Sequence, residues 1–160
     1  MSTDQTPNPV TRRSGAARTV RVLGILLVVA GAILLVAGVA TWVTVQNQLA
    51  DEKITVSEDA DHFAGDDVNG PLTAYSEAET INHHALEASG GKTYAELAQD
   101  DPVRQTVMTA SFLRASLFTS VVSFGVAAFA AGVGVLMLII GFVLLKVTSA
   151  LALLRAQPSP

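Results

Sequence analysis

Val22 to Ala50 reads VLGILLVVAGAILLVAGVATWVTVQNQLA and contains no charged residue. A second uncharged stretch, Ala115 to Leu145, reads ASLFTSVVSFGVAAFAAGVGVLMLIIGFVLL. An α-helix needs about 20 apolar residues to cross the hydrocarbon core of a bilayer, which is about 30 Å thick. Both stretches exceed that length, so the sequence predicts an integral membrane protein with two transmembrane helices.

Charge is segregated along the 160-residue chain, whose net charge is −4. Residues 51–114 contain all but one of the 14 acidic residues but only four of the 10 Lys and Arg residues. Positive residues beside a span resist translocation across the membrane. We therefore expect both termini to be cytoplasmic and residues 50–114 to be extracytoplasmic, in the cell membrane. The basic residues beside the spans are Arg12, Arg13, Arg18, Arg21, Lys146 and Arg155.

These features predict an all-α membrane protein. It has two transmembrane helices, a small, mainly helical extracytoplasmic cap, and a long final helix continuous with the second span. We assign residues 1–17 to a disordered cytoplasmic tail and residues 148–160 to a second cytoplasmic tail. The first span is expected at 18–49, the acidic cap at 50–114 and the second span at 115–147.

The first apolar stretch could also be a cleaved signal peptide. Gly38 and Ala40 have the spacing of small residues at a cleavage site. The apolar run that reaches Ala40 is, however, longer than the core of about 7–15 residues found in signal peptides. We therefore expect an uncleaved membrane anchor.

Turn and capping signals divide the cap into short elements. The alternating, β-branched run 53–56 predicts a short strand. A helix is expected over 71–89, because Pro71 suits a first helical position and the following Gly90-Gly91 can end a helix. A capping box predicts a short helix over 93–99, and the final helix is expected to begin at Pro102. The expected apolar core of the cap is Ile54, Val56, Phe63, Leu72, Tyr75, Ile81, Leu86, Tyr94, Leu97, Val103 and Val107.

Small residues recur on the predicted spans. Gly24, Gly31 and Gly38 repeat every seven positions and so mark one face of the first helix. Small residues let helix backbones approach closely within a membrane, which predicts a packing face. Its partner is either the second span, another copy of the chain or a different protein. The second helix carries two small-residue patches, Gly125 with Ala128 and Gly132, and Gly134 with Ala127 and Ala131.

The histidines are the main candidates for chemistry in the cap. Glu79, His83 and Glu87 fall on one helical face, and His62 and His84 lie elsewhere in the same acidic segment. Imidazole and carboxylate groups together can bind zinc or iron. The alternative is a solvated face with a helix-stabilising pair of side chains. We expect an external recognition face at Glu79, His83 and Glu87, and no metal or other cofactor.

Other features limit the possible functions. The chain has no cysteine, which excludes disulfides and thiolate catalysis. An acidic cap is unsuited to nucleic acid, which requires basic surfaces. Neither uncharged stretch carries an ionisable residue, which argues against a proton relay through the membrane. Arg114, at the outer end of the second stretch, could reach the lipid headgroups or pair with Asp51 or Glu52 at the end of the first stretch, and we favour the ion pair.

Four runs resemble a family of small two-span membrane proteins from actinobacteria. They are 70–75 (GPLTAY), 81–87 (INHHALE), 91–97 (GKTYAEL) and 109–122 (TASFLRASLFTSVV). The likeness covers both spans and most of the cap. It implies membrane placement and carries over no site residues, although some members are labelled "aromatic ring-opening dioxygenase".

Ring-opening dioxygenation requires a bound metal, usually iron, in a pocket that encloses an aromatic substrate. The three histidines of a small cap are a poor basis for such a pocket, so we expect no enzymatic activity. The expected function is a non-enzymatic accessory or scaffold subunit of a cell-envelope assembly. Its expected partners are the lipid bilayer and a membrane protein or further copies of the chain. The alternative is a metal-binding external sensor or a metal-dependent enzyme that uses His62, His83 and His84.

Overall fold

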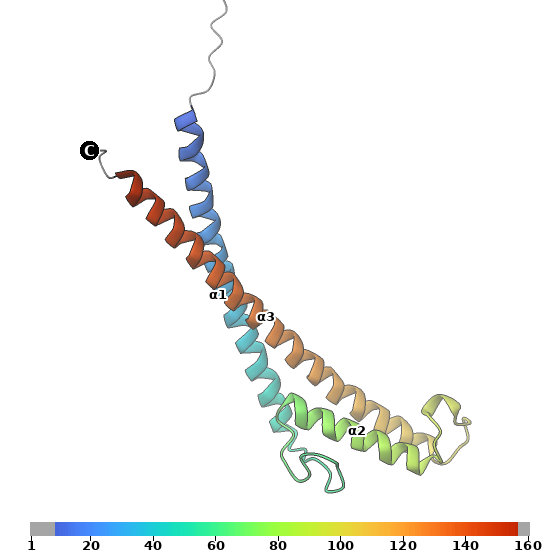
Figure 1. Cartoon of the computed structure of the whole chain (residues 1–160). Helices are drawn as coiled ribbons and strands as arrows, with labels where there is room; N and C mark the ends of the chain where they lie inside the picture. Colours follow the sequence, from blue (N-terminus) through green and yellow to red (C-terminus); the bar gives the residue numbers. More distant parts are fainter. Residues whose placement is uncertain (1–8, 157–160) are drawn as a thin grey trace, which may run out of the picture. The chain divides into compact units, whose positions relative to one another are not determined.

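The computed structural model describes residues 9–156, and all the regular structure in this range is helical. Helix α1 spans Pro9–Asp51, α2 spans Pro71–Ala88 and α3 spans Arg104–Ala156. A short 3₁₀ helix, η1, spans Tyr94–Glu96. The expectation of an all-helical chain is therefore confirmed for the described residues, as is the long final helix (Figure 1).

Helices α1 and α3 are long and apolar enough to cross a membrane, over Ala17–Asp51 and Arg104–Leu153. In their most apolar windows only 17% and 11% of the residues are buried. The core helix of a soluble protein would be mostly buried, because hydrophobic burial is what stabilises such a core. The exposed apolar surface of α1 and α3 instead suits helices that face lipid or another membrane helix.

The tails differ from the sequence-based expectation. Helix α1 begins at Pro9, so residues 9–17, which we expected in a disordered tail, are helical. Helix α3 continues to Ala156, beyond the expected end of the second span at residue 147. The remaining tail residues, 1–8 and 157–160, lie outside the described part of the chain.

The chain divides into two compact units. The first, which we call the paired-helix unit, consists of the residues up to Ala37 and those from Ala130 onward. The second, which we call the acidic unit, is Gly38–Phe129 and contains α2 and η1. Each unit has its own packing.

Glycines form the contact between α1 and α3 in the paired-helix unit. A Cβ added at Gly31 would stand 2.7 Å from the carbonyl oxygen of Gly134, and one at Gly134 would stand 2.6 Å from the backbone nitrogen of Leu35. A Cβ at Gly141 would stand 2.8 Å from the carbonyl oxygen of Gly24. Side-chain carbons do not approach backbone atoms this closely, so the two helices meet because these positions are glycine.

The other predicted glycines lie differently. Gly125 and Gly132 are exposed, and a Cβ added at either position would meet nothing within 4 Å. They therefore make no close helix contact within the described chain, because the helical face that carries them is not the one that meets α1, and their packing on another copy or another protein stays a prediction. Gly38 is buried at the start of the acidic unit.

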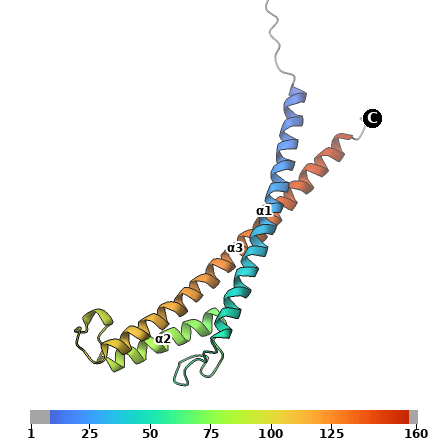
Figure 2. The same cartoon turned by 180° about the vertical axis from the view of Figure 1, so that it is seen from behind.

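In the acidic unit, α2 lies along the part of α3 that precedes residue 130, as Figures 1 and 2 both show. The small residues Ala74 and Ala78 of α2 are fully buried, which lets the helices approach closely. Trp42 and Phe124 pack edge to face with their ring centroids 4.7 Å apart. The buried core cluster consists of Leu49, Val56, Val68, Ala74, Ala78, Leu117 and Phe124.

The segment between α1 and α2 is a loop. No strand forms at 53–56, and the described chain holds a single isolated antiparallel bridge between Thr55 and Asp67. Backbone hydrogen bonds from Val56 N–H to Asp66 O (2.8 Å) and from Val68 N–H to Ile54 O (2.8 Å) close the loop. A two-stranded pairing this short has too little apolar contact to extend further.

The helix ends follow the capping signals. Pro71 begins α2 after Gly70, and its last turn is closed by Gly90 and Gly91, whose φ angles are 65° and 84°. The Thr93–Glu96 capping box forms, but it starts only the 3₁₀ helix η1 rather than a helix to residue 99. Helix α3 begins at Arg104, two residues later than expected.

Candidate functional site

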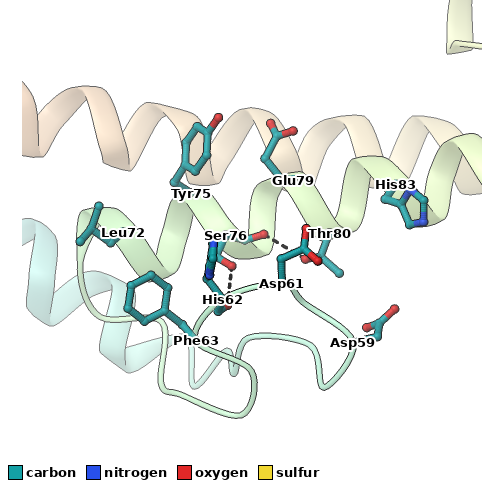
Figure 3. Close-up of a pocket in the computed structure, with 10 residues that line it drawn as sticks. All are labelled: Asp59, Asp61, His62, Phe63, Leu72, Tyr75, Ser76, Glu79, Thr80 and His83. Atoms are coloured by element: carbon teal, nitrogen blue, oxygen red, sulfur yellow. Dashed lines mark hydrogen bonds between the residues drawn. The ribbon is translucent and has the colours of Figure 1, made fainter.

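An open hollow of about 640 Å³ lies on the acidic unit between α2 and the loop that precedes it. Figure 3 shows Phe63 and Asp61 extending from the loop, and Leu72, Tyr75 and Glu79 from α2. The hollow combines apolar and acidic side chains. The full lining is Asp59, Asp61, His62, Phe63, Leu72, Tyr75, Ser76, Glu79, Thr80 and His83.

Hydrogen bonds from the loop to α2 hold one wall of the hollow in place. Glu77 is buried, at 6% exposure, and its carboxylate accepts hydrogen bonds from the Ser57 backbone N–H (2.7 Å) and the Ser57 hydroxyl (3.2 Å). The Ser76 hydroxyl donates to the carbonyl oxygen of His62 at 2.7 Å. A buried carboxylate is stable only when such donors compensate for its lost hydration, so Glu77 and Ser57 specify how the loop docks.

An exposed pair also connects the loop to α2. His84 Nε2 lies 2.6 Å from Asp59 Oδ2. The hydrogen bond to Asp59 raises the pKa of His84 above its ordinary value, and the same bond lowers the pKa of Asp59. The charged forms of both groups are therefore favoured together.

Three side chains at the hollow are apolar and exposed. Phe63 is 43% exposed, Leu72 is 66% exposed and Tyr75 is 49% exposed. We expected all three in the core of the cap, and that expectation is wrong. The core is instead completed by Val68 and by alanines of α2, whose small side chains bring α2 against α3 and leave the larger residues outside.

Phe63 has an unusual backbone conformation. Its φ angle is 62°, in the left-handed region that a residue with a Cβ seldom adopts. The conformation places the ring at the edge of the hollow, beside the neighbouring His62 ring at a centroid distance of 6.4 Å. The strain therefore accompanies an exposed aromatic ring rather than a buried one.

Arg114 does not make the predicted ion pair. Its Nη2 lies 3.6 Å from Glu79 Oε1, whereas no pair with Asp51 or Glu52 is found in the described chain. The Arg114 guanidinium also lies over the Phe118 ring, 5.1 Å from its centroid. The pairing prediction is wrong because α2 lies along α3 and brings Glu79 to Arg114, a proximity that sequence distance conceals.

The residues predicted to form a recognition face are exposed on α2, but they have separate neighbours. Glu79, His83 and Glu87 are all exposed. His83 Nε2 lies 3.2 Å from Glu87 Oε1, the spacing of a helical i, i+4 pair. Glu79 and His83 line the hollow, whereas Glu87 does not.

The histidine side chains do not point to one common site. His84 contacts Asp59, His83 contacts Glu87, and the His83 and His84 ring centroids are 6.3 Å apart. Among the residues that the structure describes, no three His, Asp or Glu side chains are placed to hold one metal ion. This arrangement gives the metal-binding alternative no support.

Sequence reasoning missed three contributors. Gly141 completes the glycine contact, and its position seven residues after Gly134 was a usable signal, because the first helix has the same period. Glu77 resembled any other exposed acidic residue of a helix, and no local pattern shows that it is buried. The pairing of Asp59 with His84 joins residues 25 positions apart and has no sequence signature.

No known protein family, curated protein or solved structure matches the chain. The resemblance to actinobacterial two-span proteins therefore stays a prediction.

Proposed function

We propose that this protein is a non-enzymatic integral membrane protein that acts as an accessory or scaffold subunit of a cell-envelope assembly. The observation that carries the proposal is the separation of an exposed apolar surface from an acidic one. The apolar side chains of α1 and α3 are mostly exposed, and almost all acidic residues lie in the acidic unit. Such a chain has one surface for the membrane and another for a polar partner.

We assign both termini to the cytoplasm and residues 50–114 to the extracytoplasmic side. The basic residues outside the acidic unit support this orientation, since they favour the cytoplasmic face. The uncharged stretches offer no ionisable group for a transport path, which supports a structural rather than a conducting role.

The contact with a membrane partner, or with a second copy, is assigned to the face of α3 that carries Gly125, Ala128 and Gly132. These residues are exposed, and a Cβ added at either glycine would meet nothing within 4 Å beyond its own stretch of helix in the described chain. Gly31 and Gly134 already form the contact between α1 and α3 in the paired-helix unit. A partner helix could approach the free face closely, because small residues leave its backbone accessible.

The acidic unit supplies the external recognition surface. Its charged and polar side chains are paired locally, as in Glu77 with Ser57 and His84 with Asp59. Catalytic sites instead bring titratable groups together around one reacting atom. The hollow on this unit is open, with exposed Leu72 and Tyr75 in its lining, which suits contact with another macromolecule better than enclosure of a small substrate.

The decisive experiment is affinity purification of the tagged full chain from native membranes in mild detergent. Mass spectrometry would identify the proteins that co-purify, and elemental analysis would measure metal in the same sample. We expect a stoichiometric membrane protein or a homo-oligomer, without stoichiometric metal. Gly132→Leu should reduce recovery of the partner, whereas Ala98→Leu, an exposed substitution outside the spans, should not.

A monomeric protein that carries stoichiometric metal would contradict the proposal. It would direct attention back to His62, His83 and His84 as ligands that rearrange on binding.

A further inference from the structure

We propose that the hollow between Phe63 and α2 is a docking site for a basic protein segment that carries an aromatic or large aliphatic anchor. The site is defined by Phe63, Leu72 and Tyr75 as its apolar part, with Asp61 and Asp59 at its acidic edge. We call it the Phe63 site. The inference rests on the proposed function and names the chemistry of the external partner.

The backbone at Phe63 is strained. The left-handed conformation, at φ 62°, is unfavourable for a residue with a Cβ, because the Cβ crowds the following carbonyl. Gly65, two residues later, adopts a positive φ of 77° without that cost. The fold would therefore be better served by glycine at position 63 as well. A phenylalanine that is strained and yet exposed is instead expected where its ring contacts another molecule.

Exposed apolar side chains are grouped at the hollow. Phe63, Leu72 and Tyr75 come from two separate segments and line the same hollow while each stays more than 40% exposed. Tyr75 is fixed edge to face against Phe118, with ring centroids 5.7 Å apart. A rigid aromatic side chain loses little conformational entropy when a partner binds, which is why such residues dominate binding energy at interfaces.

The acidic residues around the hollow indicate a basic partner. The loop from Ser57 to Asp67 carries Glu58, Asp59, Asp61, Asp66 and Asp67 and no Lys or Arg. Asp61 lines the same hollow as Phe63 and makes no ion pair with another described residue. A segment with Lys or Arg flanking its anchor would meet complementary charge here, whereas an acidic segment would be repelled.

A lipid surface is the competing occupant. Exposed Phe and Leu side chains can enter the headgroup region of a bilayer. The carboxylates that line the same hollow oppose this, since burying them beside hydrocarbon would remove their hydration without supplying a partner. The proposal therefore commits to a protein segment, and insertion into lipid is treated as an outcome that overturns it.

The test uses the full chain in lipid nanodiscs and a fluorescein-labelled synthetic peptide of alternating lysine and tryptophan. Binding is measured by fluorescence anisotropy. Two matched peptides, one of lysine and alanine and one of glutamate and tryptophan, separate the contributions of charge and anchor. Empty nanodiscs measure binding to lipid alone, and added salt should weaken the specific interaction.

The key variant is Phe63→Gly. It removes the ring and also relieves the backbone strain, so Tm should hold or rise while peptide affinity falls by about tenfold or more. Asp61→Asn should weaken binding without loss of stability. The matched controls are Phe112→Ala, which removes an aromatic side chain that is 72% exposed on α3, and Asp100→Asn, which removes an exposed carboxylate outside the hollow. Neither control should change affinity.

Several outcomes would overturn the proposal. They are no saturable binding of the lysine–tryptophan peptide, equal binding of the glutamate–tryptophan peptide, and unchanged affinity in Phe63→Gly. Because the chain has no cysteine, Phe63→Cys can carry a single bimane label. Quenching of that label by brominated lipid would assign the site to the membrane instead.

Failure of this inference can be told apart from failure of the proposed function. If Phe63→Gly co-purifies with the same membrane partner and binds the peptide as the wild type does, the docking site is wrong and the accessory role stands. If the wild-type chain purifies as a monomer without partners, the accessory role itself fails.

Discussion

Glu77 and the pair of His84 with Asp59 show how single residues hold the acidic loop in place. Glu77 is buried and accepts two hydrogen bonds from Ser57, whereas His84 and Asp59 meet on the surface. Loss of a buried acceptor leaves donors without partners, while an exposed pair is screened by water. The two contacts should therefore differ in how strongly, and at which pH, they stabilise the loop.

Replacing Glu77 by alanine should destabilise the acidic unit by about 1–3 kcal/mol, because the Ser57 N–H would lose its acceptor in a partly buried place. Glu77→Gln keeps one acceptor oxygen and should cost less. Thermal unfolding in detergent, followed by circular dichroism, would measure the change. The matched control is Glu87→Ala, which removes an exposed carboxylate of the same helix that pairs with His83 on the surface. Equal loss in the two alanine variants would contradict the prediction.

The docking of the loop should depend on pH through His84 and Asp59. The pKa of His84 is raised above its ordinary 6.5, chiefly by its hydrogen bond to Asp59, with Glu87 and Glu77 adding smaller favourable charge interactions. Its contribution to stability is complete below 6.5 and is lost as pH rises through the folded-state pKa. The pKa of Asp59 is lowered from 3.8, so its contribution is present above 3.8 and is lost as pH falls through the folded-state value.

Titration of His84 by nuclear magnetic resonance would check this prediction. We expect a midpoint above 6.5 in the wild type and a return toward 6.5 in Asp59→Asn, because the variant lacks the carboxylate. Hydrogen exchange of the loop amides, corrected for intrinsic rates, should show the greatest protection between the two midpoints. A midpoint that is unchanged in Asp59→Asn would show that the pair does not form in solution.

At the scale of elements, the contact between α1 and α3 depends on glycines at matched seven-residue spacing. Gly24 and Gly31 on one helix meet Gly141 and Gly134 on the other. Antiparallel helices that share this period bring small residues opposite one another at every second turn. The paired-helix unit thus buries one face of each helix in this contact, and the face of α3 that carries Gly132 does not meet α1.

Leucine at Gly134 or Gly31 should separate the two helices, since even a Cβ would stand within 2.7 Å of the opposing backbone. Overpacking of this kind costs about 1–3 kcal/mol or more. Spin labels attached at Val29→Cys and Ile139→Cys, both exposed positions, would report the distance between the helices by pulsed electron paramagnetic resonance. The distance should lengthen in Gly134→Leu and stay unchanged in Gly132→Leu, the matched control. An unchanged distance in Gly134→Leu would contradict the glycine contact.

At the scale of the whole molecule, the proposed orientation can be tested directly because the chain has no cysteine. A membrane-impermeant maleimide applied to intact cells should label Ala98→Cys in the acidic unit and should not label Ser159→Cys near the C-terminus. Basic residues on the cytoplasmic side and acidic residues outside give this expectation. Labelling of both positions only after the membrane is opened would place the acidic unit in the cytoplasm and contradict the proposal.

Much of the fold follows from patterns that are local in sequence. Uninterrupted apolar runs predict α1 and α3, and Pro71 with Gly90-Gly91 predicts the limits of α2 to within one residue. These signals succeed because helix length and capping depend on neighbouring residues. The predicted strand at 53–56 failed because a strand needs a partner, and only one bridge forms.

The candidate site was predicted less well, since its geometry depends on which faces meet. Glu79 and His83 were correctly placed on one exposed face, but the partner of Arg114 and the exposure of Leu72 were not foreseen. Helical periodicity shows which residues share a face, not which face is covered.

The sequence by itself determined two apolar helices, an acidic segment between them and the ends of its helix, because each depends on composition or on contacts within a few residues. Only the tertiary structure decided which glycines meet, that Glu77 is buried, and that Phe63 stays exposed in a left-handed conformation. These properties arise when segments distant in the chain come together, and burial and pairing are then set by the fit of their surfaces.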